Sequence, residues 1–144
     1  MAFAAPTLRL TEDQYRVIVG HSYDGLPDEA CGLLIGPALG GEPTGGVSEV
    51  RPCRNEDASA ITYRIDGRDQ IAAMRAAEER GEEIVGNWHS HTHTDAYPSA
   101  TDIAQAVWYP EWVYVLVSLR DGDPVLRAYR IRDGGVAECQ VVVT

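Results

Sequence analysis

The sequence is short of basic residues: 12 Lys and Arg stand against 22 Asp and Glu, giving a formal net charge of −10 over 144 residues. Nucleic-acid backbones and anionic membranes recruit basic clusters, so this shortage argues against either as the main partner. No apolar run approaches the ~18 residues that a membrane span requires. Residues 1–6 also lack the charged start and long apolar core of a signal peptide. An acidic chain of this kind is suited to a basic or mixed-charge protein surface.

Cysteine is also scarce, with three residues and no pair at the spacing of a zinc ribbon or a redox motif. Cys31 and Cys139 lie in apolar runs, where a free thiol behaves as a small buried hydrophobic residue. We therefore expect reducing conditions and a cytoplasmic protein. The length excludes a (β/α)8 barrel, which rarely has fewer than ~200 residues. It fits one domain over residues 1–144.

Hydrophobic periodicity and turn residues predict three helices among short strands. Thr11 and Gln14 form a capping-box pattern at the start of the first helix. Asp66 and Ser99 are candidate N-caps of the other two, and the third helix is expected to end near Trp108. Strands are expected at residues 7–10, 30–35, 47–53, 83–88, 112–119, 125–131 and 136–143, with a surface loop at 36–46. This order indicates an α+β fold, with a mixed, mostly antiparallel sheet flanked by helices.

The residues that carry chemistry gather behind one predicted strand. Three of the four histidines lie in the window His89-Ser-His91-Thr-His93. His89 and His91 are two apart at the end of the strand, where alternate side chains point to one face. Asp102 falls in the first turn of the helix that Ser99 caps, so its carboxylate can reach the pair. Two imidazoles and one carboxylate leave a tetrahedral metal one position for water, the pattern of catalytic rather than structural zinc.

Ordinary roles exist for the same residues. Asp102 can be a first-turn acid favoured by the helix dipole, and Ser99 can be a plain N-cap. For His93 an exposed loop position is favoured over a third ligand position, and Ser90 points to the opposite face of the strand and is expected to be structural. Other HxH chemistries are excluded because the HExxH of zincins and the H-x-E with P-C-x-x-C of zinc deaminases are absent.

The motif resembles the H-x-H-x7-S-x2-D signature of the JAMM (MPN-plus) metalloproteases. Its residues are His89, His91, Ser99 and Asp102, with seven residues between His91 and Ser99 and two between Ser99 and Asp102. That family also places a glutamate upstream, at the start of a buried strand, and Glu29 with the Gly-Leu-Leu at 32–34 matches it. The resemblance covers nearly the whole chain and implies the JAMM/MPN fold, with a cytidine-deaminase-like architecture. Within the family, the compact length and the run 89–102 look most like small actinobacterial peptidases that release cysteine from the C-terminal Gly-Gly of a ubiquitin-like sulfur-carrier protein.

The resemblance implies a role for each motif residue. His89, His91 and Asp102 would bind one Zn²⁺ per chain, with water as the fourth ligand. Glu29 would accept a proton from that water and return it to the leaving amine. Ser99 would help to stabilise the tetrahedral oxyanion. The implied partner is a ubiquitin-like sulfur carrier that ends in Gly-Gly, with no nucleic acid and no membrane, and family members often form homodimers.

Two alternatives stay open. The first is a processing peptidase or isopeptidase that trims a carrier precursor or removes a ubiquitin-like modifier. The second is a metal-free scaffold, as many relatives of this fold are, although those relatives have lost motif residues that this chain keeps. Residues 36–46 and 55–64 are the candidate walls of the substrate groove, because an extended tail often adds a strand to an exposed sheet edge.

Overall fold

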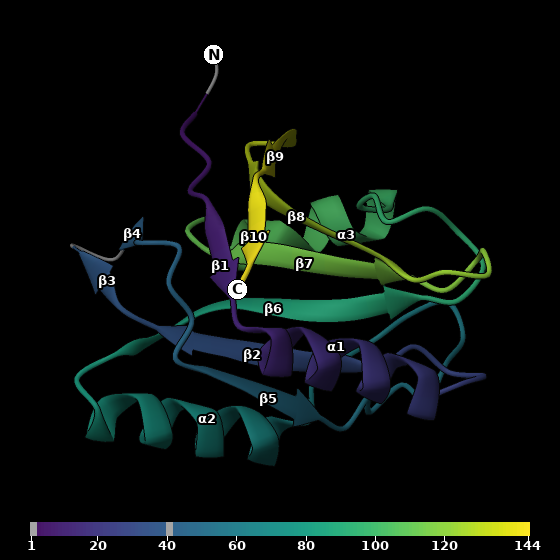
Figure 1. The fold of residues 1–144 in the computed structure, drawn as a ribbon, viewed down its shortest axis with the longest axis horizontal. Helices are drawn as coiled ribbons and strands as arrows, with labels where there is room; N and C mark the ends of the chain where they lie inside the picture. The colour runs from purple at the N-terminus through teal and green to yellow at the C-terminus, as the bar shows by residue number, and fades with distance from the viewer. Residues whose placement is uncertain (1–2, 40–41) are drawn as a thin grey trace.

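A six-stranded sheet forms the centre of the computed structural model, which describes residues 3–39 and 42–144 (Figure 1). Its strand order is β5-β2-β6-β7-β8-β9. The central pair β6 and β7 is parallel, and every other neighbouring pair in this sheet is antiparallel. The expected α+β class with a mixed, mostly antiparallel sheet is therefore confirmed. The strands of this sheet are β2 (Cys31–Gly36), β5 (Glu49–Cys53), β6 (Glu83–His91), β7 (Val113–Ser118), β8 (Val125–Arg132) and β9 (Gly135–Cys139).

The two ends of the chain pair with each other outside this sheet. β1 (Leu8–Leu10) runs parallel to β10 (Val141–Val143), as Figure 1 shows beside the C-terminus. The prediction of one continuous strand over 136–143 is therefore wrong, because β9 ends at Cys139 and β10 follows after one residue. The physical reason is tertiary: β1 buries two leucine side chains against the core, and its backbone takes the last valines as hydrogen-bonding partners.

The predicted loop at 36–46 contains a short hairpin. β3 (Ala38–Leu39) pairs antiparallel with β4 (Glu42–Pro43), so the described part of this segment is more regular than the sequence indicated. Residues 40–41 of the predicted loop, and residues 1–2 of the N-terminal segment, lie outside the described residues.

Three helices begin at the predicted caps. α1 (Glu12–Asp24) opens with the Thr11–Gln14 capping box, and both of its reciprocal hydrogen bonds are present. α2 (Gly67–Glu79) is capped by the Asp66 carboxylate. α3 (Ala100–Gln105) is capped by Ser99 and continues as a 3-10 turn over Ala106–Trp108. Among the described residues, no helix combines the length and apolar character needed to cross a membrane.

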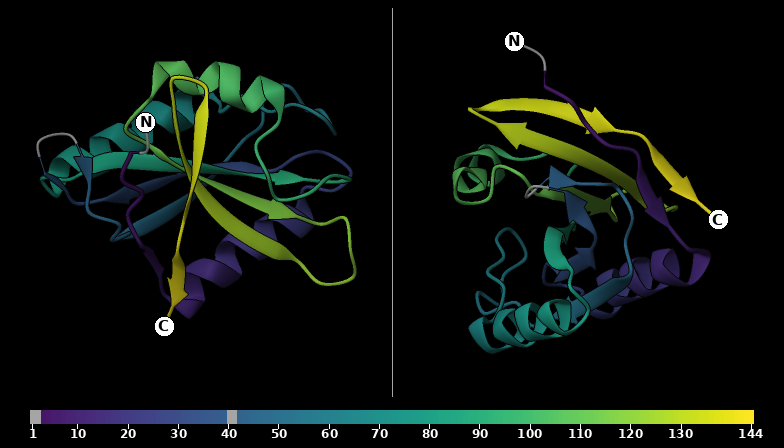
Figure 2. Two further views of the ribbon diagram at one scale, coloured as in Figure 1. Left: turned by 90° about the horizontal axis from the view of Figure 1, so that it is seen from above. Right: turned by 90° about the vertical axis from the view of Figure 1, so that its left-hand side faces the viewer.

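The helices divide between the two faces of the sheet (Figure 2). α1 packs on the face that carries Trp88, whose fully buried ring meets the edge of the His21 ring at a centroid distance of 5.2 Å. A Cβ at Gly32 would lie 2.4 Å from that indole, so the close approach requires glycine there. α2 packs on the opposite face, over the buried Leu33 and its neighbours. Because strand side chains alternate, His89 and His91 belong to this second face. Cys31 and Cys139 are buried free thiols, as expected, and so is Cys53.

Candidate metal centre

Strand β6 carries both motif histidines in the middle of the sheet. The strand was expected to end at Trp88 but continues to His91, paired with β2 on one side and β7 on the other. His89 is 1% exposed and His91 is 5% exposed. A central strand with neighbours on both edges holds its backbone rigidly, so the two imidazoles are fixed relative to each other.

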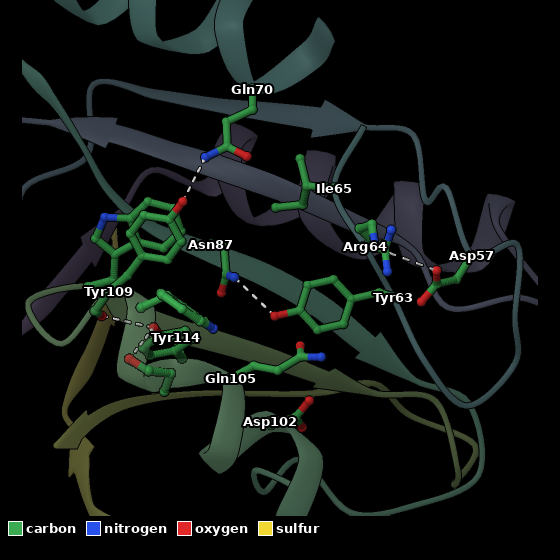
Figure 3. Close-up of a pocket in the computed structure, with 13 residues that line it drawn as sticks. Asp57, Tyr63, Arg64, Ile65, Gln70, Asn87, Asp102, Gln105, Tyr109 and Tyr114 are labelled. Carbon is green, nitrogen blue, oxygen red and sulfur yellow. Dashed lines mark hydrogen bonds and ion pairs between the residues drawn. The ribbon is translucent and has the colours of Figure 1, made fainter. Parts of the chain in front are cut away.

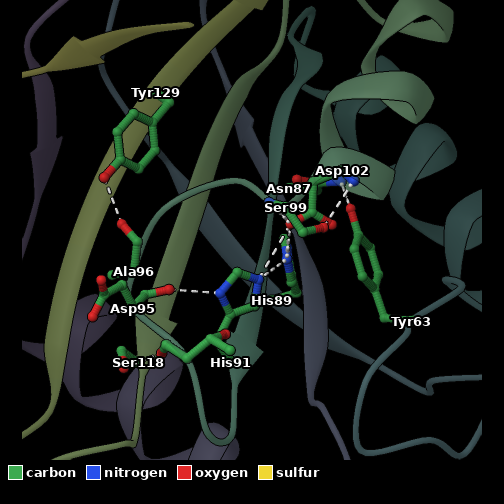
Figure 4. Close-up of polar contacts among 11 residues, drawn as sticks. Tyr63, Asn87, His89, His91, Asp95, Ala96, Ser99, Asp102, Ser118 and Tyr129 are labelled. Carbon is green, nitrogen blue, oxygen red and sulfur yellow. Dashed lines mark hydrogen bonds and ion pairs between the residues drawn. The ribbon is translucent and has the colours of Figure 1, made fainter.

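Three ligand atoms meet at one point (Figure 4). His89 Nε2, His91 Nε2 and Asp102 Oδ2 lie 3.2 Å from one another in all three pairs. A tetrahedral zinc ion with bonds of about 2.0–2.1 Å separates its ligand atoms by about 3.3–3.4 Å. The donor set and its spacing therefore fit a divalent metal ion with one open position. The chain brings these three residues together as the sequence predicts.

The two imidazoles are oriented in different ways. His91 Nδ1 lies 2.7 Å from the carbonyl oxygen of Asp95, which can only accept, so Nδ1 carries a proton and donates the hydrogen bond. When the ring is neutral, this leaves the Nε2 lone pair directed at the cluster, and when the ring is protonated, Nε2 can donate to Asp102. The His89 ring stacks on Tyr63 at a centroid distance of 4.1 Å and an angle of 18°. Its Nδ1 is buried and has no hydrogen-bond partner within 3–39 and 42–144. Packing orients His89, whereas a hydrogen bond orients His91.

The capping box of α3 aims the carboxylate. Asp102 Oδ2 accepts a hydrogen bond from the Ser99 amide at 2.9 Å, and Ser99 Oγ accepts one from the Asp102 amide at 3.1 Å. Burial raises the pKa of Asp102, but hydrogen bonds from His89 and His91 outweigh it and hold the pKa well below its usual range. The same oxygen therefore caps the helix and presents a negative charge to both histidines.

The Asp102 carboxylate acts to raise the pKa of both histidines, but their net pKa shifts have opposite signs. Burial dominates at His89 and lowers its pKa. At His91 burial also acts to lower the pKa, but the bonds to Asp102 and to the Asp95 carbonyl raise it overall. A metal ion requires both rings neutral. Protonation of His91 therefore competes with metal binding, and affinity for the ion falls as the solution becomes acidic.

Glu29 lies two residues before β2, close enough to His91 and Asp102 for their charges to act on its carboxyl. Its amide donates to the Ser59 carbonyl at 2.8 Å, and its carbonyl accepts from Asn55 Nδ2 at 3.0 Å. Glu29 is buried, with 6% of its surface exposed. Burial raises the pKa of Glu29 to about 7, and the charges of His91 and Asp102 act on it with opposite signs. A carboxyl with this pKa exchanges protons readily near neutral pH.

Ser90 links Glu29 to the ligand-bearing strand. Its side chain points away from the cluster, as predicted, and its Oγ accepts a hydrogen bond from the Ala30 amide at 2.8 Å. Its own amide donates to the Ala30 carbonyl at 2.9 Å. The serine between the two histidines therefore ties down the residue that follows Glu29.

His93 stays outside the cluster, as expected of a loop residue. It is exposed, and its Nδ1 lies 2.7 Å from the Thr92 hydroxyl. Sequence reasoning missed Tyr63, Asn87 and Asp95. Asn87 lies two residues before His89 on β6 and so faces the same way, and this spacing could have predicted its place in the site. No local sequence pattern points to Tyr63 or Asp95.

A cavity of about 320 Å³ adjoins Asp102. The predicted groove wall at 55–64 contributes to its lining through Asp57, Tyr63 and Arg64. The described residues of 36–46 contribute none. The other wall comes from the end of α3 and the 3-10 turn that follows, with the exposed Trp108.

Comparison with known proteins identifies close relatives. Residues 11–132 match the family model described as prokaryotic homologs of the JAB domain. The CysO-cysteine peptidase of Mycobacterium tuberculosis is 42% identical over 132 residues, covering 91% of this chain and 87% of that protein. The desampylase of Haloferax volcanii is 33% identical over 116 residues, covering 77% and 80% respectively. The solution structure of a Desulfitobacterium hafniense protein superposes with a TM-score of 0.83 at 33% identity, covering 96% of this chain and 93% of that one.

Proposed function

Because this chain belongs to the prokaryotic JAB family, we propose that it is a zinc-dependent peptidase acting on a ubiquitin-like sulfur-carrier protein. It hydrolyses the bond after the carrier's C-terminal Gly-Gly and releases cysteine. The observation that carries the proposal is the set of three ligand atoms spaced at 3.2 Å with the buried Glu29 beside it. The similarity to a peptidase named for its CysO-cysteine substrate supports the substrate class.

His89, His91 and Asp102 would hold one Zn²⁺ per chain. When bound, zinc lowers the pKa of a coordinated water toward ~7 and polarises the scissile carbonyl. The three candidate ligands come from a strand paired on both edges and from a capped helix, which would hold them in place for a metal ion. Such preorganisation leaves little rearrangement to accompany binding.

Glu29 is the general base and then the general acid. Its carboxylate takes one proton from the attacking water and returns it to the leaving amine of cysteine. Its pKa of about 7 in the metal-free protein suits both transfers. Burial is the main influence on the pKa of Glu29, so this carboxyl can carry a proton near neutral pH, whereas Asp102 stays ionised.

Ser99 stabilises the carbonyl oxygen as it gains negative charge. Its Oγ already accepts the Asp102 amide hydrogen. The hydroxyl proton stays available, because among the described residues it has no acceptor. One such donor is typically worth about 2.7–4 kcal/mol of barrier. Capping the helix and donating to the substrate are therefore compatible roles for the same hydroxyl.

Metal content and cleavage, measured on the same samples, test the proposal. Wild type, Asp102→Ala and the matched control His93→Ala are purified without chelators, analysed for zinc by mass spectrometry, and incubated with a carrier ending in Gly-Gly-Cys. We expect one zinc per chain and a product lighter by one cysteine for wild type and for His93→Ala, and neither for Asp102→Ala. Zinc without cleavage would reject the substrate. Absence of zinc from the wild type would overturn the mechanism and favour the scaffold alternative.

The similarity to a desampylase favours a second candidate, an isopeptidase that removes a ubiquitin-like modifier. The chemistry is the same, but the leaving amine is a lysine side chain of a second protein. Comparing kcat/KM for a Gly-Gly-Cys carrier with that for the same carrier joined to a lysine side chain separates the two. A higher value for the lysine conjugate would favour the isopeptidase.

A further inference from the structure

The cavity beside Asp102 has a floor and two walls (Figure 3). The floor is strand β6, which contributes Asn87. One wall is the segment before α2, with Tyr63, and the other is the end of α3, with Gln105. At the end of the cavity away from the cluster, Gln70 donates a hydrogen bond to the Tyr109 hydroxyl at 3.2 Å. The cavity therefore leads along β6 toward the metal ligands.

Asn87 has a hydrogen-bonding group without a partner. The residue is 5% exposed, and its Nδ2 donates to the Tyr63 hydroxyl oxygen at 3.0 Å. Its Oδ1 is buried and accepts no hydrogen bond within the described part of the chain. Buried polar atoms are nearly always satisfied, so an unpaired acceptor on a cavity floor points to a donor supplied by a ligand.

The neighbouring hydroxyl completes the pattern. Tyr63 Oη accepts the Asn87 bond, and its own proton has no acceptor among residues 3–39 and 42–144. The floor thus offers one acceptor and one donor side by side. A peptide unit, with one N–H and one C=O, is complementary to that pair. Neither residue is charged, and the nearby Arg64 is paired with Asp57 at 3.9 Å, which favours a neutral backbone over an anion.

The position along β6 identifies which peptide unit. Asn87 precedes His89 by two residues, which at ~3.3–3.4 Å per residue is about 7 Å. An extended tail covers that length in about two residues. If the tail lies in this cavity and runs along β6 toward the cluster, where its scissile carbonyl is placed, the N–H that faces Asn87 is that of the penultimate residue. Tyr63 contacts both Asn87 and His89, so it walls the same stretch and favours a residue without a side chain.

We propose that Asn87 is a specificity-determining residue whose Oδ1 accepts the backbone N–H of the penultimate glycine of the carrier tail. This inference rests on the proposed function and adds a binding contact to it. A hydrogen bond of this kind changes affinity by about tenfold.

A double-mutant cycle between enzyme and tail tests the contact. Two carriers are made by semisynthesis, one ending in Gly-Gly-Cys and one with N-methylglycine as the penultimate residue, which removes the N–H. Each is assayed for kcat/KM, and the matching products without cysteine are assayed for binding by calorimetry. The enzymes are wild type, Asn87→Leu, Asn87→Asp, which keeps an acceptor, and the control Tyr63→Phe, which keeps the ring.

We expect N-methylation to weaken binding and kcat/KM about tenfold with wild type, Asn87→Asp and Tyr63→Phe, and to have little effect with Asn87→Leu. An equal loss with wild type and Asn87→Leu would overturn the contact. The contact would also be overturned if N-methylation had little effect with Tyr63→Phe, as is expected with Asn87→Leu. Asn87 would then act by holding Tyr63 in place. Binding of the carrier without cleavage would reject the proposed activity but not the Asn87 contact. Cleavage with no coupling between N-methylation and Asn87→Leu would reject the Asn87 contact but not the activity. A carrier that is neither bound nor cleaved would reject both proposals.

Discussion

Replacing Glu29 with glutamine is expected to stabilise the metal-free protein above neutral pH while it abolishes cleavage. Burial raises the pKa of this carboxyl from its ordinary 4.5 to about 7. The folded state therefore holds the proton more tightly than the unfolded state. The stability associated with the neutral carboxyl is fully present below about pH 4.5 and is lost as the pH rises through about 7. Glutamine has the same size and no charge, so it escapes this loss.

The size of the effect follows from the two pKa values. A separation between 4.5 and about 7 corresponds to about 3 kcal/mol, at about 1.4 kcal/mol for each pH unit. The charges of His91 and Asp102 act on this carboxyl with opposite signs, and burial is the larger cause of the shift. In the zinc-loaded protein the cation favours the ionised carboxylate, and the advantage of glutamine should shrink.

Urea denaturation of chelator-treated wild type and Glu29→Gln between pH 4.5 and pH 8 measures the difference. The fully buried Trp88 provides the fluorescence signal. The unfolding free energy of Glu29→Gln should gain about 3 kcal/mol on that of wild type across this range. A difference that stays constant with pH would refute the assignment of a buried carboxyl that holds its proton when folded.

Four further perturbations have defined outcomes. Chelation should abolish cleavage of the carrier and added zinc should restore it, as followed by product mass. Ser90→Ala should lower the unfolding free energy by about 1–3 kcal/mol, because the buried Ala30 amide loses its acceptor. The same variant should have a lower kcat but an unchanged zinc content. An unaltered kcat would contradict the link between Ser90 and Glu29. Gly32→Ala should destabilise by about 1–3 kcal/mol, since the new Cβ lies 2.4 Å from the Trp88 ring. By contrast, Gly20→Ala in α1, with nothing within 4 Å, should raise the melting temperature through a gain of about 1 kcal/mol.

Much of the metal centre is encoded in short stretches of the sequence. His89 and His91 face the same way because they are two apart on a strand. Ser99 and Asp102 meet because they are the N-cap and third residue of one helix. These relations act over a few residues, so spacing alone predicts them. The same is true of the capping box at Thr11, and of the helix starts generally.

Other parts of the site depend on which segments meet. Ala30 and Ser90 are 60 residues apart and are joined by the pairing of β2 with β6, which brings Glu29 to the histidines. Sequence resemblance indicated that Glu29 belongs there, but its burial and raised pKa come from the surrounding structure.

The sequence by itself therefore determined the helices and their caps, most strands, and the set of three candidate metal ligands, since each depends on short-range periodicity or capping. Tertiary structure alone decided that the last valines leave β9 to pair with β1, that Tyr63 stacks on His89, and that the buried Oδ1 of Asn87 has no partner among the described residues. These features arise from contacts between distant segments, and local patterns carry no information about which distant surface a side chain will meet.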